Sequence, residues 1–269
     1  MSNFWQRTIT GALFVACIAF SIWEGPVLFQ LLFFIAAMGS LREFYNITTT
    51  AASRPNRIAG YLTGILSYLL ISTGAIQGID GRWAALLLPA AGLIFFAELY
   101  RKQEQPFTSI AFTLLGILYA VVPFALLNKI AGWQGGYDRN LLMGYFILLW
   151  SSDTFAYLSG SLFGRRRLFP RISPKKSWEG SIGATVATAG LAYLLGTRWE
   201  SLPVYGWMIM AVLIVVCGTL GDLTESLLKR SMGIKDSGNI LPGHGGFLDR
   251  FDALLLSVPF VWAYLAVFC

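Results

Sequence analysis

Acidic and basic residues gather in two stretches of this sequence, and the more informative stretch begins at Asp222. Asp222 lies four residues before Ser226 and seven before Lys229, which places all three side chains on one face of a helix. Asp249 and Asp252 are three residues apart and share a helical face in the same way. Mg²⁺ binds carboxylate oxygens together with substrate phosphates and water. We therefore expect Asp222 and Asp249, from two helix ends, to form one Mg²⁺ site for phosphate chemistry.

Basic residues and glycines surround these aspartates. The catalytic candidates are Asp222, Asp249, Lys229, Arg230, Lys235 and Arg250. The candidates for substrate binding in the same stretch are Ser226, Asp236, Gly243, His244, Gly245, Gly246 and Asp252. Glycines let a backbone approach phosphates closely, and lysine and arginine side chains attract the negative charge of phosphate groups.

Most of these residues also have a purely structural interpretation. Basic residues mark the cytoplasmic side of a membrane protein, aspartates stabilise helix N-termini, and glycines form turns. A lone histidine such as His244 is more often a loop residue than a catalyst. Asp222 fits the structural interpretation least, because a carboxylate inside an apolar membrane segment is costly.

The other stretch precedes an apolar segment and contains Lys175, Lys176 and Ser177. Ser173, which precedes a proline, fits the N-cap of a helix, and Ser177 is the competing N-cap. In both cases free backbone N–H groups would lie beside two lysines, which predicts an anion-binding site. Lys175, Lys176 and Ser177 are therefore substrate-binding candidates. Glu179 is expected to pair with Lys175, four residues earlier.

One apolar segment carries a polar stripe. Asp153, Tyr157 and Ser161 recur every four residues, so they lie along one side of a helix. We expect this stripe to face the interior of a helix bundle, because polar groups in a membrane segment avoid lipid. Asp153 is the last candidate for substrate binding.

The elements that must position these residues are membrane helices. Of the 269 residues, 56% are hydrophobic and 13% are charged, against roughly 25% charged in an ordinary soluble protein. This deficit of charge nearly excludes a soluble domain and predicts an all-α, polytopic membrane protein with about nine transmembrane helices. The predicted spans are 8–23, 26–46, 58–76, 84–100, 110–128, 140–161, 180–197, 204–226 and 252–268.

The distribution of lysine and arginine orients these helices. Nine spans place 16 of the 20 basic residues on one side, which the positive-inside rule assigns to the cytoplasm together with the N-terminus. Ten of these 16 lie in the loops 164–179 and 227–251, so the active site is expected at the cytoplasmic face. The net charge of +6 then reflects topology and anionic lipid headgroups rather than nucleic acid. We divide the chain into two regions. Residues 1–139 form generic N-terminal helices and are a candidate dimerisation region, and residues 140–269 form the catalytic region.

Known catalytic motifs narrow the chemistry. The sequence lacks a G-x-x-x-x-G-K-[ST] phosphate loop, an H-E-x-x-H zinc motif and a G-x-S-x-G nucleophile elbow, so hydrolysis by an activated serine has no support. One run instead resembles the signature of phosphatidate cytidylyltransferases, also called CDP-diacylglycerol synthases. It reads Ser226-x-Leu-Lys229-Arg230-x-x-x-x-Lys235-Asp236-x-Gly238-x-x-Leu241-Pro242-x-His244-Gly245-Gly246-x-x-Asp249-Arg250-x-Asp252. The likeness extends to Ser-Pro-Lys-Lys-Ser at 173–177, to Gly221-Asp222 and to the nine-span layout.

The resemblance implies that the chain transfers the cytidylyl group of CTP to phosphatidate and releases diphosphate, in phospholipid biosynthesis. It implies Mg²⁺-dependent, in-line attack of the lipid phosphate on the α-phosphorus of CTP, with Asp222 and Asp249 as metal ligands. A second cation, for which K⁺ is the candidate, is expected beside Mg²⁺. The resemblance also implies a homodimer in the cytoplasmic (inner) membrane, with CTP, phosphatidate and the lipid bilayer as partners.

Two alternative functions remain open at this point. A CTP-dependent polyprenol kinase of related architecture would use the same nucleotide and leave only a phosphate on the lipid. A transporter or channel would use buried acidic residues such as Asp153 and Asp222. The long charged loops on one side argue against transport, because transport sites lie near the bilayer midplane.

Overall fold

The structure, a computed structural model, describes residues 3–76, 81–238 and 245–269. The described residues form two compact units. The first unit combines Met1–Tyr137 with Asp236–Arg250, and the second combines Asp138–Lys235 with Phe251–Cys269. The division falls inside the last helix, and each unit is described below by itself.

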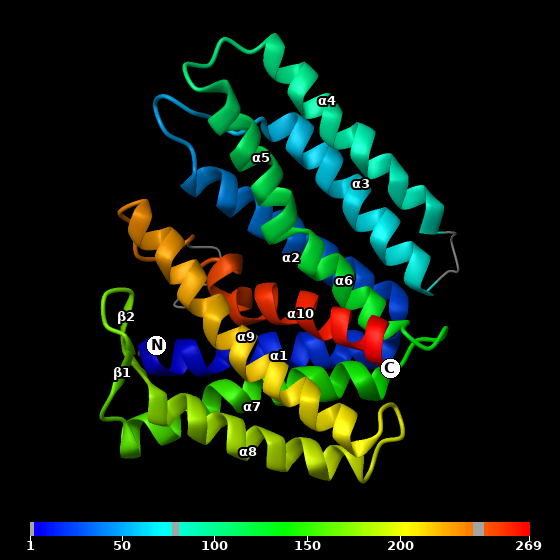
Figure 1. The fold of residues 1–269 in the computed structure, drawn as a ribbon, viewed down its shortest axis with the longest axis vertical. Coiled ribbons are helices and arrows are strands. Elements are labelled where there is room, and N and C mark those ends of the chain that lie inside the picture. Colours follow the sequence, from blue (N-terminus) through cyan, green and yellow to red (C-terminus); the bar gives the residue numbers. More distant parts are fainter. Residues whose placement is uncertain (1–2, 77–80, 239–244) are drawn as a thin grey trace. The chain divides into compact units, whose positions relative to one another are not determined.

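The first unit is helical. Its elements are α1 (Asn3–Glu24), α2 (Pro26–Ile47), α3 (Arg57–Ile76), the 3₁₀ helix η1 (Gly81–Leu86), α4 (Leu87–Leu99), α5 (Pro106–Ala120) and α6 (Val122–Ala131), as drawn in Figure 1. Pro26 and Pro106 begin two of these helices, at a position where the missing N–H of proline is not needed. Buried aromatic side chains, among them Phe33, Tyr45 and Phe124, form its core.

Polar side chains join helices inside this apolar core. The Tyr45 hydroxyl donates a hydrogen bond of 2.8 Å to the Thr113 carbonyl, which joins α2 to α5. The Asn128 amide of α6 donates to the hydroxyl oxygens of Tyr68 and Ser72 on α3, at 3.2 and 3.1 Å. Hydrogen bonds of this kind stabilise helix pairs in regions that exclude water.

The second unit combines helices with a short hairpin. Its elements are α7 (Arg139–Phe163), β1 (Arg167–Phe169), β2 (Ser173–Ser177), α8 (Trp178–Gly196), α9 (Val204–Ser231) and most of α10 (Phe247–Phe268). Helices α7, α8 and α9 pack against one another. Small residues allow the close approach of α7 and α8, since a Cβ at Gly180 would lie 2.9 Å from the Ala156 carbonyl oxygen.

The packing of α7 against α9 depends on Gly144. A Cβ at this buried glycine would overlap the ring of Trp207, which is itself fully buried. We expect Gly144→Ala to lower the free energy of unfolding by about 1–3 kcal/mol, because a rigid ring in a packed core cannot move aside. The matched control is Gly190→Ala in α8, where a Cβ would meet no atom within 4 Å. The control is expected to stabilise the helix by about 0.5–1 kcal/mol. Thermal unfolding of both variants in detergent micelles measures the difference, and equal midpoints would contradict this packing.

The described residues are mostly helical, as the predicted all-α class requires, and depart from it in one short hairpin. Strands β1 and β2 pair antiparallel, with Arg167 opposite Ser177 and Phe169 opposite Ser173. The segment 173–177 is therefore extended and does not begin a helix. Its charged residues show no alternation of apolar and polar side chains, which explains why the sequence pattern did not indicate a strand.

The hairpin also decides between the two predicted N-caps. Ser177 caps α8, with its hydroxyl oxygen accepting a hydrogen bond of 3.2 Å from the Gly180 N–H. The interpretation of Ser173 as the N-cap is wrong, because Ser173 lies in β2. Glu179, expected to pair with Lys175, instead accepts hydrogen bonds from the backbone N–H groups of Arg165 and Arg166, at 3.1–3.2 Å.

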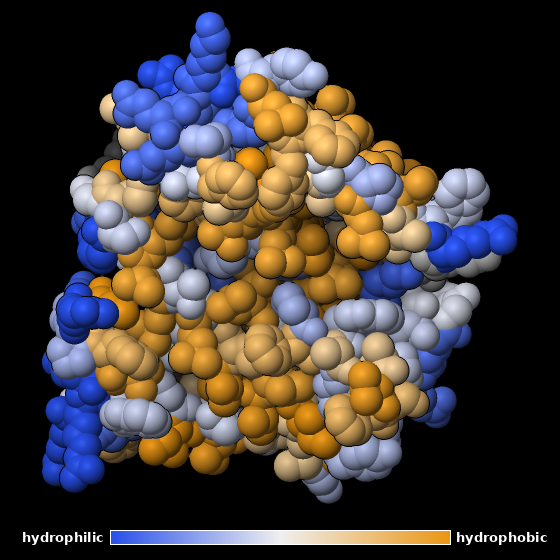
Figure 2. Space-filling view, turned by 45° about the horizontal axis from the view of Figure 1, so that its top comes forward, coloured by the Kyte–Doolittle hydropathy of each residue, from blue (hydrophilic) through white to orange (hydrophobic). Residues whose placement is uncertain are grey.

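Helices overlap all the segments predicted as membrane spans, with ends that differ by a few residues. Among the described residues, six helices are long and apolar enough to cross a membrane: Pro26–Ile47, Arg82–Leu99, Pro106–Ala131, Arg139–Phe163, Val204–Ser231 and Phe247–Phe268. Large apolar side chains such as Val27, Leu88, Phe107 and Val186 are exposed, and Figure 2 shows apolar side chains gathered on the face that it views. The chain is a multi-pass integral membrane protein, while the number of crossings and their orientation stay predictions.

Candidate functional site

Asp222 is the centre of a polar cluster in the second unit. Its Oδ2 lies 2.6 Å from Nζ of Lys176, and its Oδ1 accepts a hydrogen bond of 3.3 Å from the Ser226 hydroxyl. The Lys176 ammonium also donates to the Thr219 carbonyl, at 3.4 Å. The predicted helical face of Asp222 and Ser226 is confirmed. The structure also brings the first charged loop, through Lys176 on β2, to the Asp222 side chain on α9.

Two further carboxylates lie near Asp222. Asp252 interacts electrostatically with Asp222, Asp153 and Lys176. Its helix approaches α9 closely, since a Cβ at Gly221 would lie 2.6 Å from the Asp252 carbonyl oxygen. Two carboxylates, Asp222 and Asp252, thus interact with Lys176, and Asp153 adds a further negative group beside Asp252. This excess of negative charge favours a bound cation. The described residues nevertheless contain no group of three or more His, Cys, Asp or Glu side chains arranged to hold a metal ion.

The stripe of α7 does not face the interior of its bundle. Asp153 and Ser161 are exposed, and Tyr157 is 74% exposed. The buried positions of this helix include Tyr145 and Ser152. Each step of four residues along a helix rotates the side-chain direction by about 40°, so the stripe gradually winds away from that buried face. The predicted inward orientation is therefore wrong, although Asp153 still interacts with Asp252.

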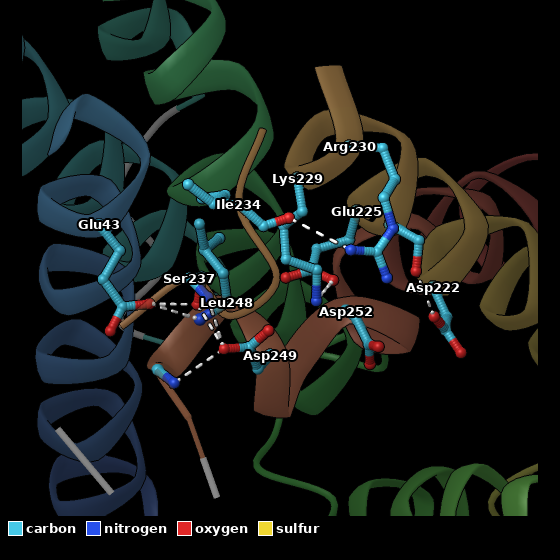
Figure 3. A network of polar contacts seen from close by, with 12 residues as sticks. Glu43, Asp222, Glu225, Lys229, Arg230, Ile234, Ser237, Leu248, Asp249 and Asp252 are labelled. Carbon is cyan, nitrogen blue, oxygen red and sulfur yellow. Dashed lines mark hydrogen bonds and ion pairs between the residues drawn. The ribbon is translucent and has the colours of Figure 1, made fainter. Parts of the chain in front are cut away.

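Lys229 has a buried partner that the sequence analysis missed. Glu225 on α9 is 1% exposed, and its carboxylate forms an ion pair with the Lys229 ammonium one turn later. Figure 3 shows the two side chains side by side on the same helix. Glu225 satisfied the criterion that singled out Asp222, a carboxylate inside an apolar segment that shares a helical face with a lysine. Arg230 is exposed and donates to the Ile234 carbonyl at 3.3 Å, just beyond the end of α9.

Asp249 organises the start of α10, in the first unit. Its Oδ2 accepts three hydrogen bonds: from the Ser237 N–H at 2.8 Å, from the Ser237 hydroxyl at 2.8 Å and from the Gly246 N–H at 2.9 Å. Gly245 has a φ of +79°, and a Cβ there would lie 2.5 Å from this same oxygen. A side chain at position 245 is therefore excluded by both the backbone conformation and the carboxylate.

A second carboxylate that the sequence analysis missed lies beside Asp249. Glu43 on α2 is 3% exposed and accepts hydrogen bonds from the Ser237 hydroxyl, at 3.0 Å, and from the backbone N–H groups of Phe247 and Leu248, both at 2.9 Å. Figure 3 shows the Glu43 carboxylate pointing toward Ser237 and Leu248. No local pattern predicts this contact, because Glu43 lies about 200 residues before its partners.

The other predicted site residues fall into two groups. Those with exposed side chains are Lys175, Lys235, Asp236 and Arg250. Gly243 and His244 lie outside the described residues. Asp222 and Asp249 belong to different units, so their convergence on one metal ion stays a prediction.

Glu179 organises the start of the charged loop that contains Lys176. The pKa of the Glu179 carboxyl lies below its ordinary value. The largest cause is a hydrogen bond from its own backbone N–H; those of Arg166 and Arg165 add to it, and lost hydration opposes it. The carboxylate is therefore ionised at neutral pH, and it holds the backbone between α7 and β1. This contact positions the hairpin on which Lys176 lies.

Comparisons with known proteins agree with the resemblance of the motifs. A family model described as the cytidylyltransferase family matches residues 5–268. A phosphatidate cytidylyltransferase of Bacillus subtilis is 35% identical over 272 residues, which cover 98% of this chain and 98% of that protein. One of Brucella abortus is 31% identical over 275 residues, covering 100% of this chain and 95% of that protein. One of Haemophilus influenzae is 46% identical over 125 residues, covering 45% of this chain and 43% of that protein.

Proposed function

This chain belongs to the cytidylyltransferase family, and from that premise we propose that it transfers the cytidylyl group of CTP to phosphatidate, forming CDP-diacylglycerol and diphosphate. The observation that carries the proposal is the match over nearly the whole chain to the family model and to relatives named phosphatidate cytidylyltransferase. The cluster of Asp222, Ser226 and Lys176 supports it, because an acidic site that contains a lysine suits phosphoryl chemistry.

The main obstacle in this reaction is electrostatic, because two polyanions must meet. The lipid phosphate is already anionic near neutral pH, so it can attack the α-phosphorus of CTP without a strong base. The basic side chains proposed to bind phosphates and stabilise the leaving diphosphate are Lys175, Lys176, Lys229, Arg230, Lys235 and Arg250. Lys229, paired with the buried Glu225, is held in place for such a role.

Carboxylate oxygens are suitable ligands for Mg²⁺, and Asp222 and Asp249 are its proposed ligands. The fit rests on the excess of carboxylates over lysine around Asp222, which a divalent cation would offset. When bound, Mg²⁺ would supply charge stabilisation to the transferring phosphoryl group. K⁺ is the proposed second cation.

The proposed setting is the cytoplasmic face of the inner membrane, with the enzyme as a homodimer. The apolar helices support membrane insertion, and the concentration of basic residues in two loops supports their cytoplasmic location. Both acyl chains of phosphatidate would stay in the bilayer while CTP enters from the cytoplasm.

An assay with CTP labelled at either the α- or the γ-phosphate tests this function. Purified protein in detergent, given phosphatidate and Mg²⁺, is expected to move the α-label, and not the γ-label, into the lipid. Chelation of Mg²⁺ by EDTA is expected to abolish transfer and its replacement to restore it. Transfer of the γ-label to a polyprenol would instead indicate a kinase. Solute flux into proteoliposomes without nucleotide, and without either lipid product, would indicate a transporter.

A further inference from the structure

Helix α10 begins without a capping side chain of its own. The residue before the helix is Gly246, which has no side chain to accept hydrogen bonds from the first free N–H groups. Glu43 of α2 supplies the missing acceptor, because its Oε1 and Oε2 accept from the N–H groups of Phe247 and Leu248. Asp249 reaches back to the Gly246 N–H, as the third residue of a capping box does. The start of α10 is thus held by two carboxylates, one from a distant helix.

Small residues leave room for this arrangement. A Cβ at Gly246 would overlap the Glu43 carboxylate, and a Cβ at Gly238 would lie 2.6 Å from its Oε1. One turn before Glu43 on α2, a Cβ at Gly39 would overlap the Phe247 ring. Serine or aspartate at position 246, the usual N-caps, would therefore exclude Glu43. The packing on both sides of the carboxylate is built around its present position.

Ser237 links the two carboxylates. Its single hydroxyl proton is shared between them, with the oxygen 3.0 Å from Oε2 of Glu43 and 2.8 Å from Oδ2 of Asp249. Two negative groups this close repel each other, and four backbone N–H donors offset that repulsion: those of Ser237, Gly246, Phe247 and Leu248. The positive end of the α10 dipole adds to this stabilisation. A shift of Glu43 would consequently alter the surroundings of Asp249.

We infer that Glu43 is a positioning residue for the cytidylyl transfer reaction, an inference that rests on the proposed function. It holds Ser237 and the first turn of α10, and through them it sets the position of the Asp249 carboxylate. The contacts of Glu43, with Ser237 and with the start of α10, flank in sequence the segment that contains the candidates Gly243 and His244. Glu43 itself is not a candidate for substrate contact. A buried carboxylate far away in the sequence is thus part of the active-site framework.

The variant Glu43→Gln tests this inference. Glutamine keeps the size of the side chain, but its NH₂ group would face N–H donors where a carboxylate oxygen now accepts. We expect kcat with CTP and phosphatidate to fall roughly 10- to 100-fold, the range found when residues that orient site ligands are changed. We also expect faster hydrogen exchange at the amides of 245–249, measured without nucleotide or Mg²⁺. The matched control is Glu98→Gln on α4, a carboxylate that is also 3% exposed and pairs with Arg101 at 2.7 Å.

The outcomes separate a positioning role from a general structural one. If Glu43→Gln and Glu98→Gln both lose thermal stability while folded Glu43→Gln keeps its kcat and KM, the inference is overturned. Unchanged hydrogen exchange at the amides of 245–249 in Glu43→Gln would overturn it as well. If Glu43→Gln does not fold, Ser237→Ala decides, because it removes only the shared hydroxyl. It should lower kcat, and wild-type kinetics in that variant would overturn the inference. If the wild-type chain shows no cytidylyl transfer, the proposed function fails, while the exchange measurement still tests whether Glu43 holds this segment.

Discussion

Replacing Asp222 by asparagine is expected to lower the rate of CDP-diacylglycerol formation by about 10²- to 10³-fold, the range typical for loss of one preorganised electrostatic group. Asparagine has nearly the same shape, so the hydrogen bond from Ser226 is retained while the charge that faces Lys176 disappears. The measurement is transfer of α-labelled CTP into lipid at saturating substrate. Glu200→Gln, which neutralises an exposed carboxylate in the same unit, is the control and is expected to retain activity.

A companion variant shows whether Asp222 acts only by holding Lys176. If that were its whole role, Lys176→Met would lose as much activity as Asp222→Asn, and the double variant would be no worse than either. We expect Asp222→Asn to be the more severe single variant, because Asp222 is also a proposed Mg²⁺ ligand. We also expect the concentration of Mg²⁺ needed for half-maximal activity to rise. Full activity in Asp222→Asn would contradict the assignment of this site.

The helices were predictable because the physics behind them is local. A long apolar segment in lipid must satisfy its backbone hydrogen bonds internally, and it therefore forms a helix. Prolines such as Pro26 and Pro106 mark where two of these helices begin. The shared face of Asp222 and Ser226 followed from helical spacing alone. Ser177 was recognised as one of two possible caps, and only the pairing of β1 with β2 decided in its favour.

The candidate site was only partly predictable because its contacts join distant parts of the chain. The ion pair of Lys176 with Asp222 depends on how the hairpin packs against α9, which spacing along the sequence does not determine. Glu43 lies near the end of a predicted span, where a charge needs no explanation, so its burial was missed. A usable signal did exist at Gly246, the residue before α10. Glycine has no side chain to cap a helix, so the first free N–H groups need an acceptor from elsewhere in the chain.

The second large effect is expected from Asp249→Asn. Three donors converge on Oδ2 of Asp249, and each hydrogen bond to a charged group contributes about 1.5–3 kcal/mol. An asparagine would place either a neutral carbonyl oxygen or an N–H group against them. We expect cytidylyl transfer to fall by at least about a hundredfold. We also expect hydrogen exchange at 236–238 to accelerate, because the contact of Ser237 is weakened. Glu104→Gln, an exposed carboxylate of the same unit, is the control for loss of one charge.

The variant Asp249→Glu separates the charge of this residue from its position. It keeps the carboxylate but extends it by one methylene group, beyond the position at which Oδ2 accepts its three hydrogen bonds. The longer side chain must therefore leave the Ser237 and Gly246 donors, and we expect a loss of activity close to that of Asp249→Asn. Near wild-type activity in Asp249→Glu would show that a negative charge alone suffices at this position. That result would contradict the view that the start of α10 is built to hold one carboxylate oxygen in one place.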